Sequence, residues 1–175
     1  MVRNKRLLKI LAVLILLVMC VCIFTGCENK SKVDSENKQS SQVSADCEQP
    51  IEYLVEGLKK ADANMLLKAF PSFISDYMVN VFTDDYLKQS LSDAKEQYGD
   101  DIEISYKTIS KVEIPENEIK DVEDRIKKSF NEVVDITKGY VLNVENITKG
   151  NKLEKTTENI YEVYEIEGNW YVLDL

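Results

Sequence analysis

An uncharged apolar run from Ile10 to Phe24 sets the first limit on how this chain can fold. Four basic residues and no acidic residue precede the run, and strongly polar sequence follows it. A basic segment before an apolar stretch of this length is typical of a secretory signal. A membrane-spanning helix usually needs about 20 apolar residues, so the run is short for a transmembrane anchor. We therefore expect the folded part of the chain to begin well after Phe24 and to lie outside the cytoplasm.

The apolar run ends in the step Phe24-Thr25-Gly26-Cys27, where two small residues precede a cysteine. This step resembles the lipobox of bacterial lipoproteins, although Phe24 stands where leucine is commonest. The resemblance implies cleavage between Gly26 and Cys27 and a diacylglyceryl group on the Cys27 sulfur. Two acyl chains at one residue give stable anchoring, which a single chain does not. The bilayer is thus an expected partner, and the extracytoplasmic face of the cell membrane is the expected location. The alternative is an incidental Cys27 thiol after an uncleaved anchor.

Charge and composition narrow the expected partners further. Removal of residues 1–26 takes away four positive charges, so the net charge falls from −9 to −13. An acidic chain without a basic stripe is repelled by nucleic acid, and we expect no nucleic-acid partner. Lysine greatly outnumbers arginine, which occurs three times (Arg3, Arg6 and Arg125), and this bias resembles proteins of low-GC Gram-positive bacteria.

Residues 27–49 are expected to form the lipidated cysteine and a disordered tether. Their composition is polar and lacks a helical or strand period, so the segment cannot bury enough apolar surface to fold. A flexible chain of this length has an end-to-end distance of about 26 Å. Cys47 lies within the segment, and we expect it to be a thiol in a flexible tether, with pairing to another chain as the alternative.

Residues 50–175 carry the patterns of a single α+β domain. Pro50, Asp62, Pro71 and Thr83 are each suited to begin a helix and precede apolar residues at helical spacing. The apolar stripes that they introduce are Ile51, Leu54, Val55 and Leu58; Met65, Leu66, Ala69 and Phe70; Ile74, Tyr77, Met78 and Val81; and Leu87, Leu91 and Ala94. The last of these helices is expected to end near Gly99.

Alternation of apolar and polar residues begins at Ile102 and predicts a strand that runs, with a bulge, to Ile114. Pro115 is expected to begin a fifth helix, with Ile119, Val122, Ile126 and Phe130 at helical spacing. Three further strand patterns follow in the sequence: one directly after Gly139, one at 158–166 and one at 170–175. Gly168-Asn169 is a two-residue hairpin signal between the last two.

The expected fold is therefore N-terminal helices packed on a curved antiparallel sheet of about four strands, with a helix inserted after the first strand. The stretches "LKKADANMLLKAFP" and "YEIEGNWYVLDL" resemble small exported domains of the cystatin-like or nuclear-transport-factor-2-like kind. That resemblance implies a concave sheet face that can form a pocket. The helix at 115–130 departs from that pattern.

The residue types present exclude several kinds of catalytic site. The chain has no histidine, so Ser-His-Asp and Cys-His arrangements and His-containing zinc sites are excluded. Asp84-Asp85 and Asp100-Asp101 are the obvious carboxylate pairs, and both are interpreted as structural, at a helix N-terminus and in a turn. We expect no catalytic residue, no metal site and no cofactor.

Four aromatic residues in the last hairpin are the candidate ligand-binding residues. Tyr161, Tyr164, Trp170 and Tyr171 would line a pocket for an apolar or sugar-like ligand if they share the concave face. Ordinary packing within the sheet is the favoured alternative, because strands need aromatic residues for cross-strand contacts.

The anchor, the spacer and the small domain together predict a membrane-anchored bacterial lipoprotein. We expect it to act as a non-enzymatic accessory or binding module in the cell envelope, with another envelope protein as its partner. A small-ligand-binding lipoprotein is the alternative, and an enzyme that works through carboxylates is a further one.

Overall fold

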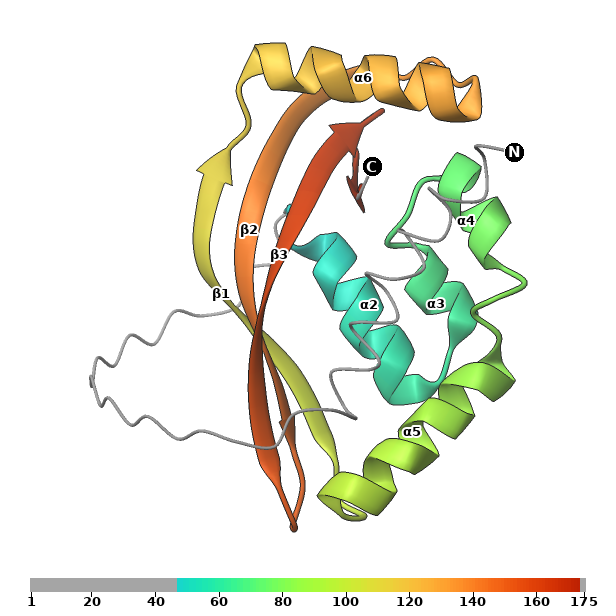
Figure 1. Cartoon of the computed structure of the whole chain (residues 1–175), viewed down its shortest axis with the longest axis vertical. Coiled ribbons are helices and arrows are strands. Elements are labelled where there is room, and N and C mark those ends of the chain that lie inside the picture. Colours follow the sequence, from blue (N-terminus) through green and yellow to red (C-terminus); the bar gives the residue numbers. More distant parts are fainter. Residues whose placement is uncertain (1–46, 174–175) are drawn as a thin grey trace. The chain divides into compact units, whose positions relative to one another are not determined.

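Residues 47–173, the part of the chain that the computed structural model describes, form an α+β fold (Figure 1). In chain order the elements are α2 (Gln49–Lys60), α3 (Ala63–Leu67), α4 (Ser72–Met78), α5 (Asp84–Tyr98), β1 (Glu103–Glu113), α6 (Glu116–Phe130), β2 (Ile136–Lys149), β3 (Glu154–Ile166) and β4 (Asn169–Val172). The predicted fold class is confirmed, including the helix inserted after the first strand.

The helices begin where the sequence places their first residues. The Asp62 carboxylate accepts a hydrogen bond from the backbone N–H of Met65 at 2.9 Å, and the Thr83 hydroxyl accepts one from Tyr86 at 3.2 Å. Each side chain thereby satisfies an N–H group that the first helical turn leaves without a partner. Pro71 and Pro115 directly precede α4 and α6, as predicted.

Ile74 and Met78 of the predicted apolar side of α4 are buried, but the prediction is wrong for Tyr77 and Val81. The helix ends at Met78, and the Met78 carbonyl accepts hydrogen bonds from the N–H groups of Val81 and Phe82 in the turn that follows. Val81 therefore lies outside the helix and is 39% exposed, and Tyr77 is 47% exposed.

The four strands form an antiparallel meander in the order β1-β2-β3-β4. The pairing of β1 with β2 shifts register between Thr108 and Ser110, which confirms the predicted bulge. In the last hairpin Ile166 pairs with Asn169, so the turn residues are Glu167 and Gly168, one position earlier than predicted. Both have positive φ, 53° and 77°, as a type I′ hairpin turn requires.

Helices pack along one side of the sheet and across its upper end. Figure 1 shows α2 to α5 along that side of the curved sheet and α6 across the end. Alternate residues of the two long strands share a face, so Leu142 and Val144 of β2 lie on the same face as Tyr161 and Val163 of β3. All four side chains are buried and form the centre of the core.

The strand β2 begins at Ile136, three residues before Gly139, where the strand pattern in the sequence starts. Gly139 pairs with Tyr164 of β3. A Cβ atom at Gly139 would lie 2.8 Å from Cδ1 of Tyr164, so the tyrosine ring packs directly over the glycine. The close packing of that ring explains why a residue with low strand propensity stands inside β2.

The fold begins earlier in the chain than the predicted boundary. The Glu48 carbonyl accepts hydrogen bonds from the N–H groups of Ile51 and Glu52, so the first helical turn starts before Pro50. Cys47 precedes this turn and is only 2% exposed. The expectation of a thiol within a flexible tether is therefore corrected: Cys47 belongs to the folded part and its side chain is buried.

Candidate functional site

The two residues of the predicted lipidation and cleavage step, Gly26 and Cys27, lie outside the described residues. The four predicted pocket residues lie within them, and the structure does not bring the four together. Tyr161 and Tyr164 are three positions apart in β3 and lie on opposite faces of the sheet. The other three residues divide between two separate cavities: Tyr164 lines one beneath α6, and Trp170 and Tyr171 line one at β4.

Tyr161 lies in the core rather than in either cavity. Its hydroxyl accepts a hydrogen bond from the Asn146 side-chain amide at 3.2 Å. Burial raises the pKa of the Tyr161 hydroxyl, and the hydrogen bond from Asn146 partly opposes that rise. The favoured interpretation, ordinary packing in the sheet, describes this residue.

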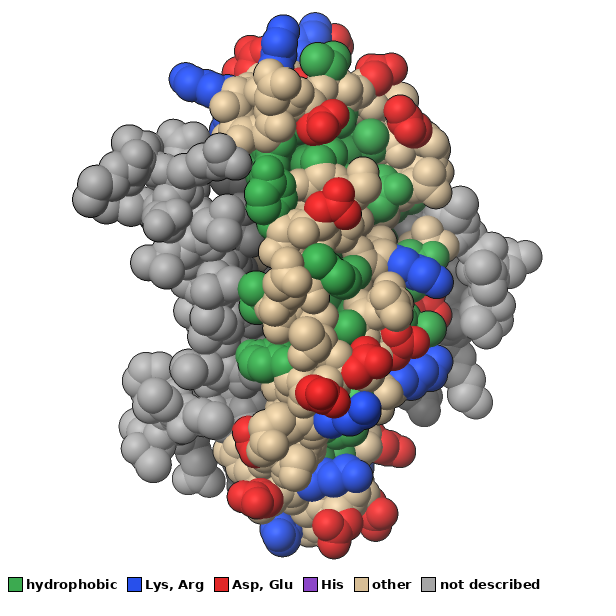
Figure 2. Space-filling view, turned by 90° about the vertical axis from the view of Figure 1, so that its right-hand side faces the viewer, with side chains coloured by type: hydrophobic (Ala, Val, Ile, Leu, Met, Phe, Trp, Pro, Cys, Tyr) green, Lys and Arg blue, Asp and Glu red, His purple; other side chains and the backbone are tan. Residues whose placement is uncertain are grey.

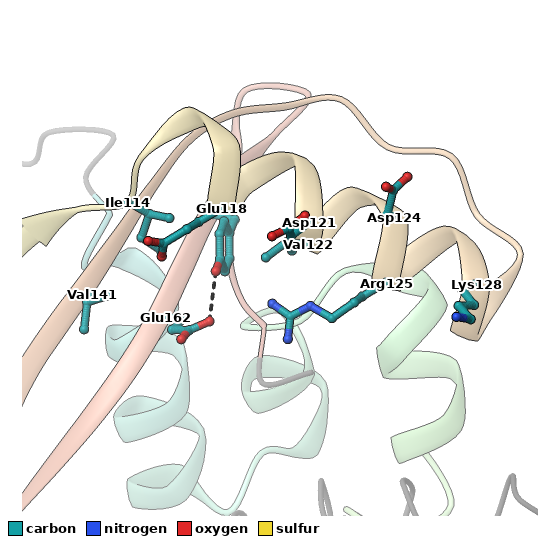
Figure 3. A pocket seen from close by; sticks show the side chains of 10 residues that line it. Ile114, Glu118, Asp121, Val122, Asp124, Arg125, Lys128, Val141 and Glu162 are labelled. Carbon is teal, nitrogen blue, oxygen red and sulfur yellow. Dashed lines mark hydrogen bonds between the residues drawn. The ribbon is translucent and has the colours of Figure 1, made fainter.

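The first cavity, which we call the α6 cavity, has a volume of about 510 Å³ and lies between α6 and the strands β2 and β3. Tyr164 lines it and donates a hydrogen bond to the Glu162 carboxylate at 2.9 Å. Figure 3 shows Arg125 of α6 extending beneath the helix toward Glu162, whereas Asp124 points away. Burial first, and then the bond to Glu162, raise the pKa of the Tyr164 hydroxyl, so the neutral phenol is the stable form.

The α6 cavity combines charged and apolar side chains. Four carboxylates and two basic groups line it: Glu118, Asp121, Asp124, Glu162, Arg125 and Lys128. The apolar part of the lining comes from Ile114, Val122 and Val141. Its one aromatic side chain, Tyr164, is 2% exposed and already has a hydrogen-bond acceptor. The cavity therefore offers a ligand no exposed aromatic ring.

The second cavity, which we call the β4 groove, has a volume of about 620 Å³ and lies where β4 meets α2, α3 and α4. Trp170 and Tyr171 line it, together with Tyr53 of α2 and Phe70, which follows α3. Trp170 and Phe70 are buried, and Tyr53 and Tyr171 are half-buried. The groove thus has a buried aromatic floor and two partly exposed aromatic walls.

The aromatic floor is held by neighbouring rings and by the backbone. The Trp170 and Tyr140 rings lie 5.5 Å apart between centroids and are tilted by 31°, which is a favourable aromatic arrangement. The Lys111 ammonium lies over the other ring of this pair, 4.2 Å from the Tyr140 centroid. The backbone N–H of Val172 donates to the Ala69 carbonyl at 2.8 Å, which ties β4 to the segment after α3.

Polar side chains surround the mouth of the β4 groove. These side chains carry three amides, two hydroxyls, one ammonium group and one carboxylate. Asn64, Asn169, Lys68 and Asp76 are among the exposed residues of this set. The Lys68 ammonium lies 5.9 Å from the Tyr53 ring centroid, within cation–π range. The groove therefore combines aromatic contact surface with neutral hydrogen-bonding groups and has no net charge.

The face that carries α4 displays apolar side chains between two ends that are rich in charged groups (Figure 2). Tyr77, Val79 and Val81 are the large apolar residues of this region with the greatest exposure, at 47%, 49% and 39%. Val79 also lines the β4 groove, so the exposed apolar residues continue to its rim.

Of the two carboxylate pairs, Asp84-Asp85 lies in the first turn of α5, as the structural interpretation expects, and Asp100-Asp101 lies in the bend between α5 and β1. Asp84 is the first residue of α5, and its carboxylate accepts a hydrogen bond from the Ala63 N–H at 2.9 Å, which joins α5 to α3. Asp85 lies 3.6 Å from the Lys88 ammonium on the exposed face of the same helix. Among residues 47–173, no group of three or more acidic or cysteine side chains is arranged to hold a metal ion.

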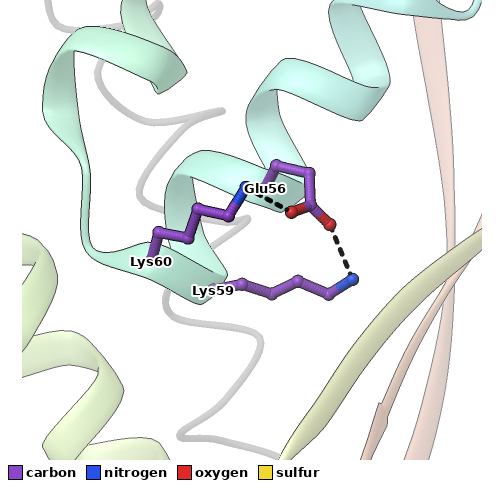
Figure 4. Close-up of polar contacts among 3 residues, drawn as sticks. All are labelled: Glu56, Lys59 and Lys60. Atoms are coloured by element: carbon purple, nitrogen blue, oxygen red, sulfur yellow. Dashed lines mark hydrogen bonds and ion pairs between the residues drawn. The ribbon is translucent and has the colours of Figure 1, made fainter.

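A compact charged cluster closes the end of α2. The Glu56 carboxylate accepts from the ammonium groups of Lys59 at 2.8 Å and Lys60 at 3.0 Å (Figure 4). These hydrogen bonds lower the pKa of Glu56. Exposed ion pairs of this kind contribute little to stability. The two ammonium groups nevertheless balance the charge of the Glu56 carboxylate, so it is unsuited to bind a further cation.

No helix within the described range is both long enough and apolar enough to span a membrane. Comparisons with protein families, with characterised proteins and with solved structures found no match to this chain. The site must therefore be judged on its own chemistry.

Tyr53, Asn64 and Lys68 are among the groove residues that the sequence did not indicate. They lie in helices or, for Lys68, directly after one, where an exposed polar or half-buried aromatic residue is common. The only local signal for a groove residue was Asn64, which is the second residue of α3. The other residues of this helix are apolar.

Proposed function

We propose that this chain is a lipid-anchored lipoprotein on the extracytoplasmic face of the cell membrane, where it acts as a non-enzymatic binding or accessory module. One observation carries the proposal: a basic segment and an apolar run end in Thr25-Gly26-Cys27, and polar sequence then leads to the folded part, whose first described residue is Cys47. Anchoring through a diacylglyceryl group on Cys27 makes a transmembrane helix in the folded part unnecessary.

The folded part supports a binding role through its surface. The candidate carboxylates Asp84 and Asp85 serve helix contacts, and the open β4 groove offers aromatic and amide groups. The exposed apolar residues Tyr77, Val79 and Val81, at and just after the end of α4, add a surface that an envelope partner can cover. The resemblance to cystatin-like or nuclear-transport-factor-2-like domains remains a prediction within this proposal.

A second candidate function, binding of a small ligand, is supported by the β4 groove itself. Two of the four predicted pocket residues, Trp170 and Tyr171, line a cavity whose volume lies within the range of about 300–1,000 Å³ that is usual for ligand sites. The two functions are compatible, because a ligand-binding domain held at the membrane can report to a partner.

Membrane fractionation of cells that produce Cys27→Ser tests the anchor. The expected result is an uncleaved precursor or release of the chain from the membrane, since the sulfur that would carry the lipid is lost. Cys22→Ser is the matched control, because Cys22 lies in the apolar run behind Val21 and has no small residue before it. A mature, membrane-bound Cys27→Ser form would contradict the proposal.

Crosslinking in intact cells, followed by mass spectrometry, tests the accessory role. A tagged wild-type chain should capture a specific envelope protein, and the unanchored Cys27→Ser chain should capture much less of it. A wild-type chain that enriches no envelope protein over the Cys27→Ser chain would argue against the accessory role and favour the ligand-binding alternative.

A further inference from the structure

The geometry points to a neutral saccharide as the ligand of the β4 groove. Tyr53 and Tyr171, which are half-buried and lie on elements far apart in the sequence, line the groove together with the buried Trp170. The exposed residues Asn64 and Asn169 add two side-chain amides to the same lining. A sugar ring has C–H faces that pack on aromatic rings and hydroxyl groups that pair with amides. The inference rests on the binding role proposed above.

The charge of the groove disfavours a strongly charged ligand. Lys68 and Asp76 are the charged side chains that line it, one of each sign. The Lys68 ammonium already faces the Tyr53 ring at 5.9 Å. An anion or a cation would thus meet one attractive and one repulsive group, and it would lose its hydration against an aromatic floor.

The mouth of the groove disfavours a wholly apolar ligand as well. Such a ligand would cover the amides of Asn64 and Asn169 without giving them hydrogen bonds in return. A buried polar group that is left without a partner costs free energy comparable to the bond it loses. The Asn169 side-chain amino group already donates to the Glu167 carbonyl at 3.3 Å, and the side-chain oxygen is an acceptor that a ligand hydroxyl can use.

An extended peptide is disfavoured by the backbone at this edge. Peptides that add a strand to a sheet need a row of outward N–H and C=O groups. The outward N–H of Val172 already donates to Ala69, and β4 is only four residues long. Little of the edge is left for a strand to bind, so recognition here depends on side chains.

The test is a titration of the full chain with N,N′-diacetylchitobiose and with cellobiose. Trp170 is the only tryptophan in the chain, so its fluorescence reports directly on the groove. Calorimetry on the same samples detects binding that leaves the fluorescence unchanged. The chain is kept in a detergent without a sugar headgroup, because a glucoside or maltoside would compete. We expect saturable binding with a dissociation constant below about 10 mM.

Matched variants place the ligand in the groove. Asn64→Ala should weaken binding about fivefold or more, as expected for loss of one hydrogen bond. Asn117→Ala is its control, because Asn117 is also exposed and also occupies the second position of a helix, α6. Tyr53→Ala should weaken binding about tenfold, whereas Tyr86→Ala removes an equally half-buried helical tyrosine away from the groove.

Several results would overturn the inference. Absence of binding to both disaccharides by fluorescence and calorimetry would refute it. Binding of dodecanoate or of hexa-alanine in place of the disaccharides would assign the groove to another class of ligand. Equal binding by wild type, Asn64→Ala and Tyr53→Ala would place the saccharide elsewhere. None of these results depends on Cys27. The fractionation experiment therefore tests the lipid anchor independently of the ligand.

Discussion

Gly57 lies in the middle of α2 at the point where this helix meets α3. A Cβ atom at this position would lie 2.7 Å from the backbone N and from Cβ of Leu66. Replacement of an exposed helical glycine by alanine usually stabilises a protein by about 1 kcal/mol through helix propensity. Here the new methyl group would meet backbone atoms, which cannot rotate away, and overpacking of this kind costs about 1–3 kcal/mol. With the propensity gain subtracted from the middle of this range, we expect Gly57→Ala to lower the free energy of unfolding by about 1 kcal/mol.

Urea denaturation followed by far-ultraviolet circular dichroism measures this effect. With a denaturant slope of about 1–3 kcal/mol per molar urea, the midpoint should fall by roughly 0.3–1 M. Ser92→Ala on the exposed face of α5 is the control, and it should be neutral or slightly stabilising because its methyl group has space. A Gly57→Ala chain that is more stable than wild type would refute the reasoning, since propensity would then outweigh the contact with Leu66.

Three further predictions concern single side chains. Asp84→Ala should lower stability by about 1–2 kcal/mol in urea denaturation, because it removes the acceptor for Ala63 N–H and a negative charge at a helix N-terminus; Asp85→Ala, whose side chain is 96% exposed, should change it by less than about 0.5 kcal/mol. The raised pKa of Tyr164 stabilises the fold below about pH 10, and this stabilisation is lost as the pH rises further. Tyr164→Phe should therefore show a smaller loss of stability between about pH 10 and pH 12, and an unchanged loss would contradict this. In a variant whose other three cysteines are serine, Cys47 should react with iodoacetamide slowly in buffer and rapidly in urea; rapid reaction in buffer would show that the thiol is accessible in solution.

The elements of this fold could be predicted from local sequence because their boundaries depend on local chemistry. Asp62 and Thr83 accept hydrogen bonds from residues three positions later, so the signal and the helix lie in the same few residues. The β1 bulge was likewise visible as a break in alternation. The start of the fold at Cys47 was missed, because its burial depends on residues elsewhere in the fold and its neighbours in sequence are polar.

The β4 groove could be predicted only in part, because its walls come from separate elements. Tyr53 lies in α2 and Lys68 directly follows α3, about a hundred residues before β4 in the chain, and only the packing of the helices against the last strand brings them to Trp170. A single sequence contains the apolar stripe that drives this packing. The position of the helices along the sheet cannot be predicted from a single sequence. That position determines which exposed side chains come into contact.

The separation of Tyr161 from Tyr164 follows from the alternation of side chains along a strand, and the spacing of the two residues in the sequence already indicates it. Residues an odd number of positions apart in one regular strand point to opposite faces, so Tyr161 and Tyr164 could not share a pocket once both lay in β3. Trp170 and Tyr171 are neighbours in β4, so their side chains also point to opposite faces of the sheet. Both nevertheless line the β4 groove, because β4 is an edge strand and a cavity at an edge can be reached from either face. The position of a strand in the sheet thus decides whether alternation separates two neighbours or allows both to contact one ligand. For that reason Tyr171, which is half-buried at the edge, is a better candidate for ligand contact than Tyr161, which is enclosed in the core.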